Sequence, residues 1–269
     1  MKRRILTGFA ILLAIAMLAA ACSSSGTSSS NSNSSSNTVQ LDKNVNLAVP
    51  TSASAIQNFT NSSISAATTK AEAQAIIDAI FGEDGPFGSF LSVNQQYNSY
   101  SFNRSTANRA VKTEPLQLNF TEKDLFEGDD DLIKYLTIKG YIDATARYDD
   151  AREDFYALNG EAKARVEIKE GFTDDNYQTF GVVAGEIRAN NITINGDKAS
   201  GSVFYNINGA INVADTSNKS VKCIFKINSL LSISGNDITV TVEYTAYGNN
   251  NTLLLTDRKQ IKQDLADYL

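Results

Sequence analysis

The side chains that could do chemistry in this chain are of few kinds. The 269 residues include 30 acidic side chains and two cysteines, Cys22 and Cys223, but no histidine. Ser-His-Asp and Cys-His catalysis and histidine-ligated zinc are therefore excluded. The sequence also has no Walker loop, GxSxG elbow, Ser-x-x-Lys motif or Cys-x-x-Cys motif. We assign no catalytic residue, no metal ligand and no cofactor, and expect a protein that is not an enzyme.

Cys22 stands at a junction between an apolar stretch and a polar one. Three basic residues at positions 2–4 precede the uncharged residues 5–18, and three alanines at 19–21 lead to the cysteine. A charged start, an apolar core and a small-residue exit are the layout of a secretory signal peptide. The apolar run is shorter than the roughly 20 residues of a membrane-spanning helix. We therefore expect residues 1–21 to be removed.

The same stretch resembles the lipobox signal peptide of bacterial lipoproteins, although Ala19 stands where leucine is commonest. The resemblance covers residues 1–22 and implies that the thiol of Cys22 carries a diacylglyceryl group. Cleavage then leaves Cys22 as an acylated N-terminus, and two or three acyl chains hold a protein stably on a bilayer. Ser23, rather than aspartate, follows the cysteine, which in this family goes with the outer membrane. The alternative is an ordinary signal peptide cut after Ala21.

The segment that follows Cys22 predicts a flexible tether. Residues 23–38 are almost entirely serine and asparagine, a composition that cannot build a core. A coil of this length spans roughly 20–25 Å. We therefore expect residues 22–38 to tether a single β-rich globular domain, residues 39–269, to the face of a membrane in the cell envelope.

The charge of the mature chain limits its partners. Loss of residues 1–21 leaves 21 basic against 30 acidic residues, a net charge of −9. Nucleic acids and anionic lipid surfaces both attract basic patches. We therefore expect no nucleic-acid partner, and contact with the membrane through the acyl chains at Cys22. A protein or a lipid remains a possible ligand.

The second cysteine, Cys223, lies in the sequence VKCIFKI. It shares the apolar side of that stretch with Val221, Phe225 and Ile227. Because burial in apolar surroundings raises the pKa of a thiol, we expect a buried, inert group rather than a reactive one.

Acidic residues cluster between predicted strands, which raises the question of calcium. The clusters lie at residues 127–131, 149–154 and 174–175. Calcium prefers carboxylate-rich loops, but none of the clusters has the ligand spacing of an EF-hand. We interpret them as solvated turns. A tyrosine-rich stretch, residues 97–102, is either a contact surface or a strand whose aromatic side chains face the core.

One helix is strongly predicted. Thr69 and Glu72 form a capping box, and Gly82 supplies the stop. The apolar positions recur on one face of a helix over residues 69–81, which must pack on another element because a helix this short is not stable alone.

Most of the chain from residue 132 onward predicts strands. Apolar and polar residues alternate with period two, which is typical of antiparallel sheets with one wet face. The predicted strands are 137–148, 160–171, 180–194, 200–213, 220–233 and 238–247, with a short one at 249–255. A bend is expected near Asn190 and Asn191, and a hairpin at residues 195–197.

The remaining stretches give weaker patterns. Residues 39–66 predict a short edge strand followed by irregular chain, and residues 83–115 predict a loop with one strand at most. Asp257 and Gln260 suggest a second capping box, so we expect a C-terminal helix over residues 257–268.

Together these elements predict a mainly β fold of the α+β class. Strands this long must twist, so we expect a long-stranded antiparallel meander that forms a curved sheet or a half-open barrel. The helix at 69–81 would pack on its concave face. Three functions remain open: a non-enzymatic lipoprotein that binds a protein or builds the envelope, a carrier of a lipid or other apolar ligand, and a carboxylate-based hydrolase.

Overall fold

The computed structural model describes residues 40–81, 112–126, 129–149, 154–174, 177–195, 198–232 and 237–264. Its ten strands form one sheet, in which eight follow the order β10-β9-β8-β7-β6-β4-β3-β2, while β1 joins β8 and β5 joins β6. The strands are β1 (Ser65–Ala66), β2 (Lys112–Thr121), β3 (Leu136–Asp149), β4 (Asp154–Ile168), β5 (Thr173–Asp174), β6 (Tyr177–Asn195), β7 (Lys198–Asp215), β8 (Lys219–Ser232), β9 (Asp237–Tyr247) and β10 (Leu253–Asp264).

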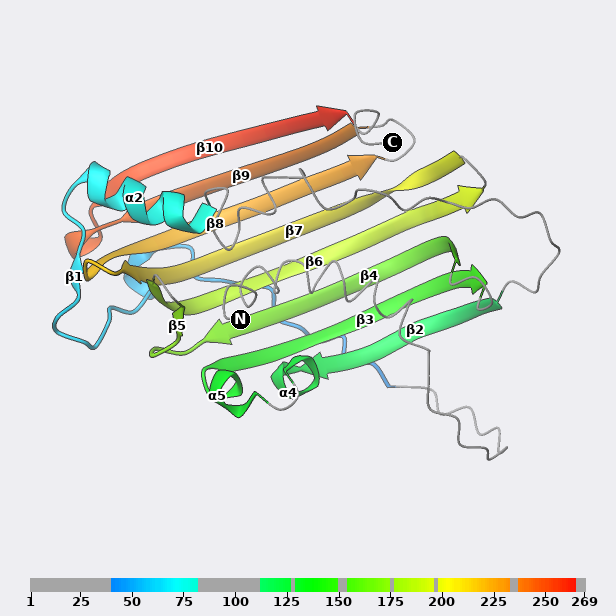
Figure 1. Cartoon of the computed structure of the whole chain (residues 1–269), viewed down its shortest axis with the longest axis horizontal. Helices are drawn as coiled ribbons and strands as arrows, with labels where there is room; N and C mark the ends of the chain where they lie inside the picture. Colours follow the sequence, from blue (N-terminus) through cyan, green and yellow to red (C-terminus); the bar gives the residue numbers. More distant parts are fainter. Residues whose placement is uncertain are drawn as a thin grey trace.

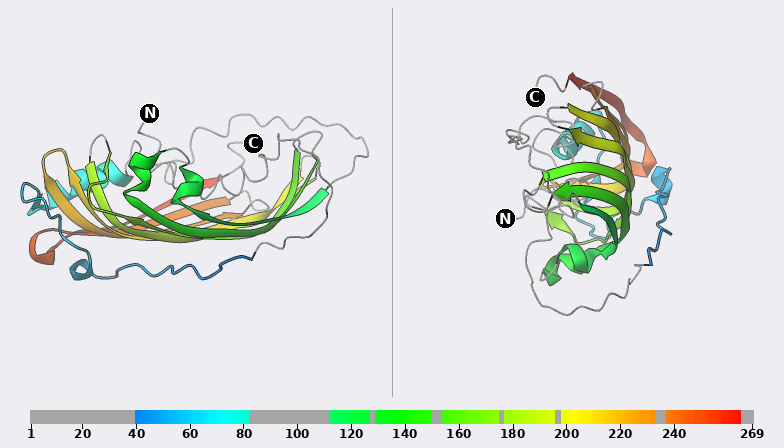
Figure 2. Two further views of the ribbon diagram at one scale, coloured as in Figure 1. Left: turned by 90° about the horizontal axis from the view of Figure 1, so that it is seen from below. Right: turned by 90° about the vertical axis from the view of Figure 1, so that its right-hand side faces the viewer.

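The sheet is a long antiparallel meander, as predicted. Each strand along the path pairs antiparallel with its neighbours, and only β1 pairs parallel, with β8. Within the described ranges the sheet is open, because β2 and β10 are its two ends and do not pair with each other. Figure 1 shows the strands side by side, and Figure 2 shows that the sheet is strongly curved. Of the two predicted forms, the open curved sheet is the one observed.

The helices are short and few in the described ranges. They are α2 (Lys70–Phe81), α4 (Glu122–Leu125) and α5 (Asp130–Ile133), with 3₁₀ turns η2 (Ala53–Ala55) and η3 (Asn249–Asn251). The predicted capping box starts α2: the Glu72 N–H donates to Thr69 Oγ1, and the Thr69 N–H donates to the Glu72 carboxylate, both at 3.2 Å. No helix in the described residues is long and apolar enough to cross a membrane.

The bend predicted near Asn190 and Asn191 agrees with the observed pairing of β6 and β7. Pairing between β6 and β7 shifts between Asn190 and Thr193, and Asn191 has a φ of 46°. Asparagine tolerates this left-handed conformation better than most residues. Beyond the bend, Asn195 pairs with Lys198, which closes the predicted hairpin.

The predicted C-terminal helix is wrong. Residues 253–264 form β10, in which Asp257 pairs with Tyr244 and Gln260 pairs with Thr241 of β9. The helix was predicted from residues 257–268 alone. Strand β10 instead forms because it pairs with β9, which is a separate segment of the chain. Tertiary pairing often overrides such a weak local preference. Residues 265–269 lie outside the described ranges.

Two weaker predictions also need correction. No edge strand forms near Val45, Leu47 and Val49; that stretch is extended but unpaired, and β1 is the only strand before α2 in the described residues. The strand allowed within residues 83–115 exists but begins at Lys112 and runs to Thr121 as β2, while residues 82–111 lie outside the described ranges.

The two faces of the sheet have opposite character. Most of the buried apolar residues of the long strands point to the concave face, which carries α2, and most of their polar neighbours point to the convex face. Residues 40–60, here called the strap, cross the convex face as an extended chain that contains η2 (Figure 2). The main core lies on the concave side.

Candidate functional site

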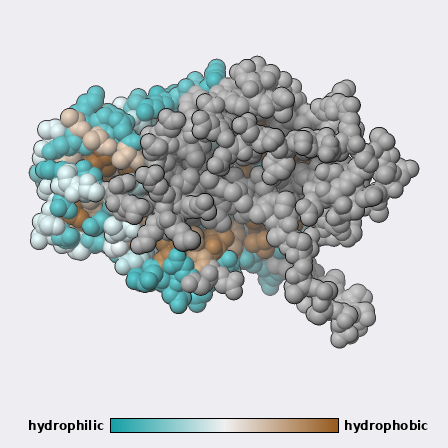
Figure 3. All heavy atoms as spheres, viewed as in Figure 1, coloured by the Kyte–Doolittle hydropathy of each residue, from teal (hydrophilic) through white to brown (hydrophobic). Residues whose placement is uncertain are grey.

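The concave face is apolar across the middle strands of the sheet. Pairing places Ile142, Ala162 and Ile187 in one row across β3, β4 and β6. Val166 and Val183 pair in another row of the same face. All five side chains are buried and belong to one hydrophobic cluster. Figure 3 views this side and shows hydrophobic side chains where the face is visible.

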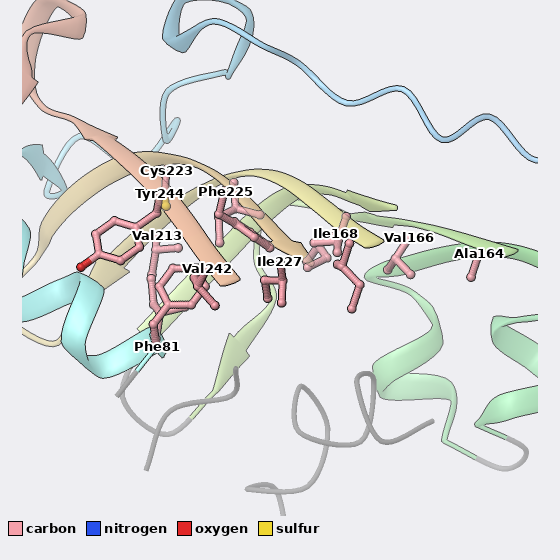
Figure 4. Close-up of a cluster of buried hydrophobic side chains, with 14 of the residues drawn as sticks. Phe81, Ala164, Val166, Ile168, Val213, Cys223, Phe225, Ile227, Val242 and Tyr244 are labelled. Atoms are coloured by element: carbon pink, nitrogen blue, oxygen red, sulfur yellow. The ribbon is translucent and has the colours of Figure 1, made fainter. Parts of the chain in front are cut away.

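Helix α2 packs on one end of this face. Its last residue, Phe81, stacks on Tyr244 with ring centroids 5.4 Å apart and meets the edge of Phe225 at 5.2 Å (Figure 4). Such aromatic pairs add to the free energy that burial of their area already gives. The Tyr244 hydroxyl donates to Asp257 at 3.1 Å, and burial raises the pKa of Tyr244 to about 12. This end of the face is therefore filled by the protein itself.

Two glycines let aromatic rings lie flat on the sheet. A Cβ at Gly140 would stand 2.2 Å from the Phe120 ring, and one at Gly209 would stand 2.1 Å from the Phe225 ring. A side chain larger than glycine would push each ring off the strands. The concave face is thus built from glycine, alanine and branched aliphatic residues, and the rings of Phe120 and Phe225 lie flat on it.

The apolar face extends beyond α2. In the described ranges, α2 makes its main contacts with β7 to β10, and α4 and α5 make theirs with β2 and β3. Ala164, Val166 and Ile168 of β4 lie on the same side of the sheet as Phe81 but further along it (Figure 4). Their side chains carry no hydrogen-bonding group. The stretch over β4 and β6 can therefore contact only apolar groups without a desolvation cost.

The convex face binds the strap largely through the main-chain groups of the strap. The Asn119 amide makes two hydrogen bonds to the strap: it donates to Gln40 O at 3.0 Å and accepts from the Asp42 N–H at 2.9 Å. Arg165 donates to Ala48 O at 2.5 Å. Ion pairs from Lys139 to Asp42 and from Lys43 to Asp143 join the same region.

The far end of the strap is fastened by a small apolar contact. Ile56 is buried, and Phe59 meets the edge of the Phe180 ring at 4.8 Å. Thr60 then donates to Glu170 from both its N–H and its hydroxyl, at 2.7 and 2.9 Å. The strap is therefore held along its whole length and is part of the folded domain.

Carboxylates meet on the convex face, which bears on the hydrolase hypothesis. Asp143 and Glu161 pair across β3 and β4. A hydrogen bond from Lys43 lowers the pKa of Asp143, and one from the Tyr141 hydroxyl at 2.6 Å lowers the pKa of Glu161. Lys163 lies 3.6 Å from Glu161. Both carboxylates are thus held ionised, whereas a glycosidase-type acid needs a raised pKa.

Beneath the strap, one lysine is buried without a carboxylate partner in the described residues. Lys222 is 8% exposed and donates to Ala53 O at 3.2 Å and to Asn251 Oδ1 at 3.1 Å. Burial lowers its pKa. Asn212, its neighbour across β7 and β8, donates to Gln57 O at 2.9 Å, while its buried Oδ1 has no partner among the described residues. These two side chains fasten η2 and the chain after it to the sheet.

The residues singled out in the sequence fall in three places. Cys22 and the stretch 97–102 lie outside the described ranges. Cys223 is fully buried on the concave face, and burial raises the pKa of its thiol. Asp129 caps α5 by accepting from the Leu132 N–H at 3.1 Å. No group of three or more acidic or cysteine side chains in the described ranges could hold a metal ion.

The strap contacts were missed by sequence reasoning. Arg165 and Asn119 were polar residues on an alternating strand, with nothing to separate them from solvated neighbours. The only signal was the alternation of Val45, Leu47 and Val49, which was interpreted as a short edge strand.

The chain matches no protein-family model, no curated protein and no solved structure.

Proposed function

We propose that the protein is a non-enzymatic binding lipoprotein of the bacterial cell envelope, anchored by acyl chains at Cys22. Its ligand is apolar, a lipid acyl chain or a molecule of similar character, held on the concave face. The observation that carries the proposal is the continuous row of buried apolar side chains on β3, β4 and β6 beyond α2, on a sheet that is open within the described ranges. The lipobox resemblance of residues 1–22 supports the anchor and an outer-membrane location.

An apolar ligand is favoured over a protein partner by the surface of the described residues. Only two large hydrophobic side chains there are exposed, Leu230 and Leu253. Protein interfaces are enriched in aromatic residues, and the described surface shows no such patch. The open edges also resist strand addition: Pro115 lies in β2, and β10 carries Arg258, Lys259 and Lys262.

Native mass spectrometry tests the ligand. The mature chain with Cys22→Ser is purified from a bacterial host without detergent, and we expect it to carry an apolar molecule that organic solvent extracts. Ala164→Phe adds volume to the concave face and should lower the bound fraction, while Thr245→Phe on the convex face should not. Circular dichroism verifies that both variants fold. If the Cys22→Ser chain without a concave-face substitution carries no bound molecule, the proposal is contradicted.

Fractionation tests the anchor separately. The wild-type protein should sediment with membranes and carry acyl mass at Cys22, and Cys22→Ser should be released from them. Membrane association that survives this substitution would show that the anchor lies elsewhere.

A further inference from the structure

One small polar side chain, Ser229 of β8, lies on the concave face among apolar neighbours. It is 3% exposed and pairs with Tyr205 of β7 and with Val240 of β9. The alternation of burial along β8 places its side chain on the same face as Phe225 (Figure 4). Ser229 is four residues further along β8 than Phe225, about 13 Å at roughly 3.3 Å per residue. It therefore lies well past the contact between Phe225 and the last residue of α2.

Ser229 belongs to the row of residues that we propose as the ligand surface. Ile142, Ala162 and Ile187 pair in turn across β3, β4 and β6. Ile187 then pairs with Tyr205, and Tyr205 with Ser229. At about 4.8 Å per strand, the row covers roughly 19 Å along the sheet from Ile142 to Ser229. A chain that lies on the apolar part of this row can therefore bring one end to the serine.

The hydroxyl of Ser229 has no hydrogen-bond partner among the described residues. An unpaired hydroxyl in an apolar site carries a desolvation cost, and native structures hold few such groups. Three other buried polar side chains, Asn212, Ser220 and Lys222, bond to the strap or to β1. Thr179 is buried and unpaired in the described ranges too, but it lies beyond the last pair between β4 and β6 and so outside these rows. Ser229 is thus an unused polar group within the apolar rows.

We propose that the ligand of the concave face is an amphipathic lipid that carries a hydroxyl or ester group, and that this group bonds to Ser229 while the apolar chain lies on β3, β4 and β6. This inference rests on the function proposed above and adds the polar group to it. Ligand sites are commonly apolar surfaces on which a few polar groups fix the orientation of the ligand. A serine hydroxyl both donates and accepts, so it can pair with an alcohol or with an ester carbonyl.

A carboxylate is disfavoured at this position. Among the described residues, the concave-side cation nearest to Ser229 in the strand register is Lys259, which lies two strands away on β10, at the edge of the sheet. A carboxylate beside Ser229 would therefore be buried without a partner of opposite charge, which is costly. An uncharged polar group avoids that cost.

Competition binding tests the polar group. The mature chain with Cys22→Ser is stripped of lipid on a hydrophobic resin and loaded with the neutral fluorescent probe phenylnaphthylamine, which decanol or decyl chloride then displaces. Both compounds have the same carbon chain, but only decanol has a hydroxyl. Adding Ser229→Ala should weaken the binding of decanol about threefold to tenfold, the loss of one ordinary hydrogen bond, and should leave that of decyl chloride unchanged.

A matched control is Thr179→Val, which removes the other unpaired hydroxyl and should change neither affinity. If neither compound displaces the probe, the function proposed for the concave face fails, and this inference fails with it. If both displace the probe but Ser229→Ala weakens them equally or not at all, only the inference about Ser229 is overturned. Tighter binding of decanoate than of decanol would also overturn it. Without ligand, Ser229→Ala should be at least as stable as the parent chain in urea, and a loss of stability would show that the hydroxyl bonds within the protein, which overturns the inference as well.

Discussion

The two faces of this sheet are covered by segments of the same chain in two different ways. On the concave face, α2 is held by packing of apolar side chains, such as Phe81 on Tyr244 and Phe225. On the convex face, the strap is held mainly by polar side chains that reach its main chain, such as Asn119 and Arg165. The first kind of contact depends on side-chain shape, and the second is largely indifferent to the sequence of the strap.

Because of this difference, the concave face determines the stability of the domain, whereas the convex face determines how the strap is attached. Burial of apolar area is the dominant favourable term in folding, so the concave face sets the stability of the domain. Exposed ion pairs and hydrogen bonds contribute about 1 kcal/mol or less each. The strap therefore adds modestly to stability but fixes its own first residues, Gln40 and Asp42, at Asn119 near the β2 edge.

The sharpest test of the comparison places one charge on either face of β9. Val242 is fully buried on the concave face, while its neighbour Thr241 points to the convex face. Val242→Asp should lower the free energy of unfolding by about 3–5 kcal/mol, because it leaves an uncompensated charge in an apolar site. Thr241→Asp should change it by about 0.5 kcal/mol or less. Urea denaturation followed by circular dichroism measures both, and equal effects would mean that the faces are misassigned.

The next largest effect concerns the helix. Phe81→Ala removes the ring that stacks on Tyr244, and truncation of a buried phenylalanine costs about 3–5 kcal/mol. We expect about 3 kcal/mol, since Phe81 ends α2 and its surroundings can relax. Lys70→Ala at the exposed start of α2 is the control and should have little effect. A loss below about 1 kcal/mol for Phe81→Ala would show that α2 does not depend on this contact.

A smaller and more local effect is expected for the strap. Arg165→Met keeps the apolar stem but removes the donor to Asn46 O and Ala48 O. We expect a loss of about 1–2 kcal/mol, with faster amide hydrogen exchange confined to the strap. Arg188→Met is the matched control, because Arg188 pairs with Glu186 and makes no contact with the strap. Global loss of protection in Arg165→Met would show that strap and sheet unfold as one unit.

The sequence carried most of the information about the sheet and the helix. Alternation such as that of residues 160–171 reports one buried face directly, and the Thr69–Glu72 box is a local signal for a local structure. Strand β2 was missed although Leu116, Leu118 and Phe120 alternate with polar neighbours, because Pro115 argues against a strand. At the edge of a sheet, proline is tolerated because no further strand needs its missing N–H.

The C-terminal strand and the strap were beyond the local signals. Asp257 and Gln260 fit a helix start, but pairing with β9 depends on residues 237–247, which a local pattern does not include. The strap is bound largely through its carbonyl and amide groups, which every residue has. Its site on the convex face therefore leaves almost no mark on its own sequence, and only the fold shows that Arg165 and Lys222 face it.

The smallest effect on the free energy of unfolding is expected at Lys222, which combines burial, as on the concave face, with polar contact to the strap, as on the convex face. This side chain is buried like a core residue yet binds the strap like a surface one. Lys222→Met loses two hydrogen bonds but also removes the cost of burying a charge. Because these changes oppose each other, the free energy of unfolding at neutral pH should shift by about 1 kcal/mol or less.

The pH dependence of stability isolates the charge of Lys222 from its hydrogen bonds. Burial lowers its pKa in the folded state, so the folded protein releases this proton at a lower pH than the unfolded chain does. Between the two pKa values the unfolded chain binds more protons, and stability rises with pH. In the wild type this rise ends near the pKa of about 10.4 of a lysine in an unfolded chain. Lys222→Met should lack it, whereas Lys226→Met, an exposed lysine of the same strand, should retain it. Identical pH profiles for wild type and Lys222→Met would mean that Lys222 is hydrated in solution and that the strap does not seal this part of the convex face.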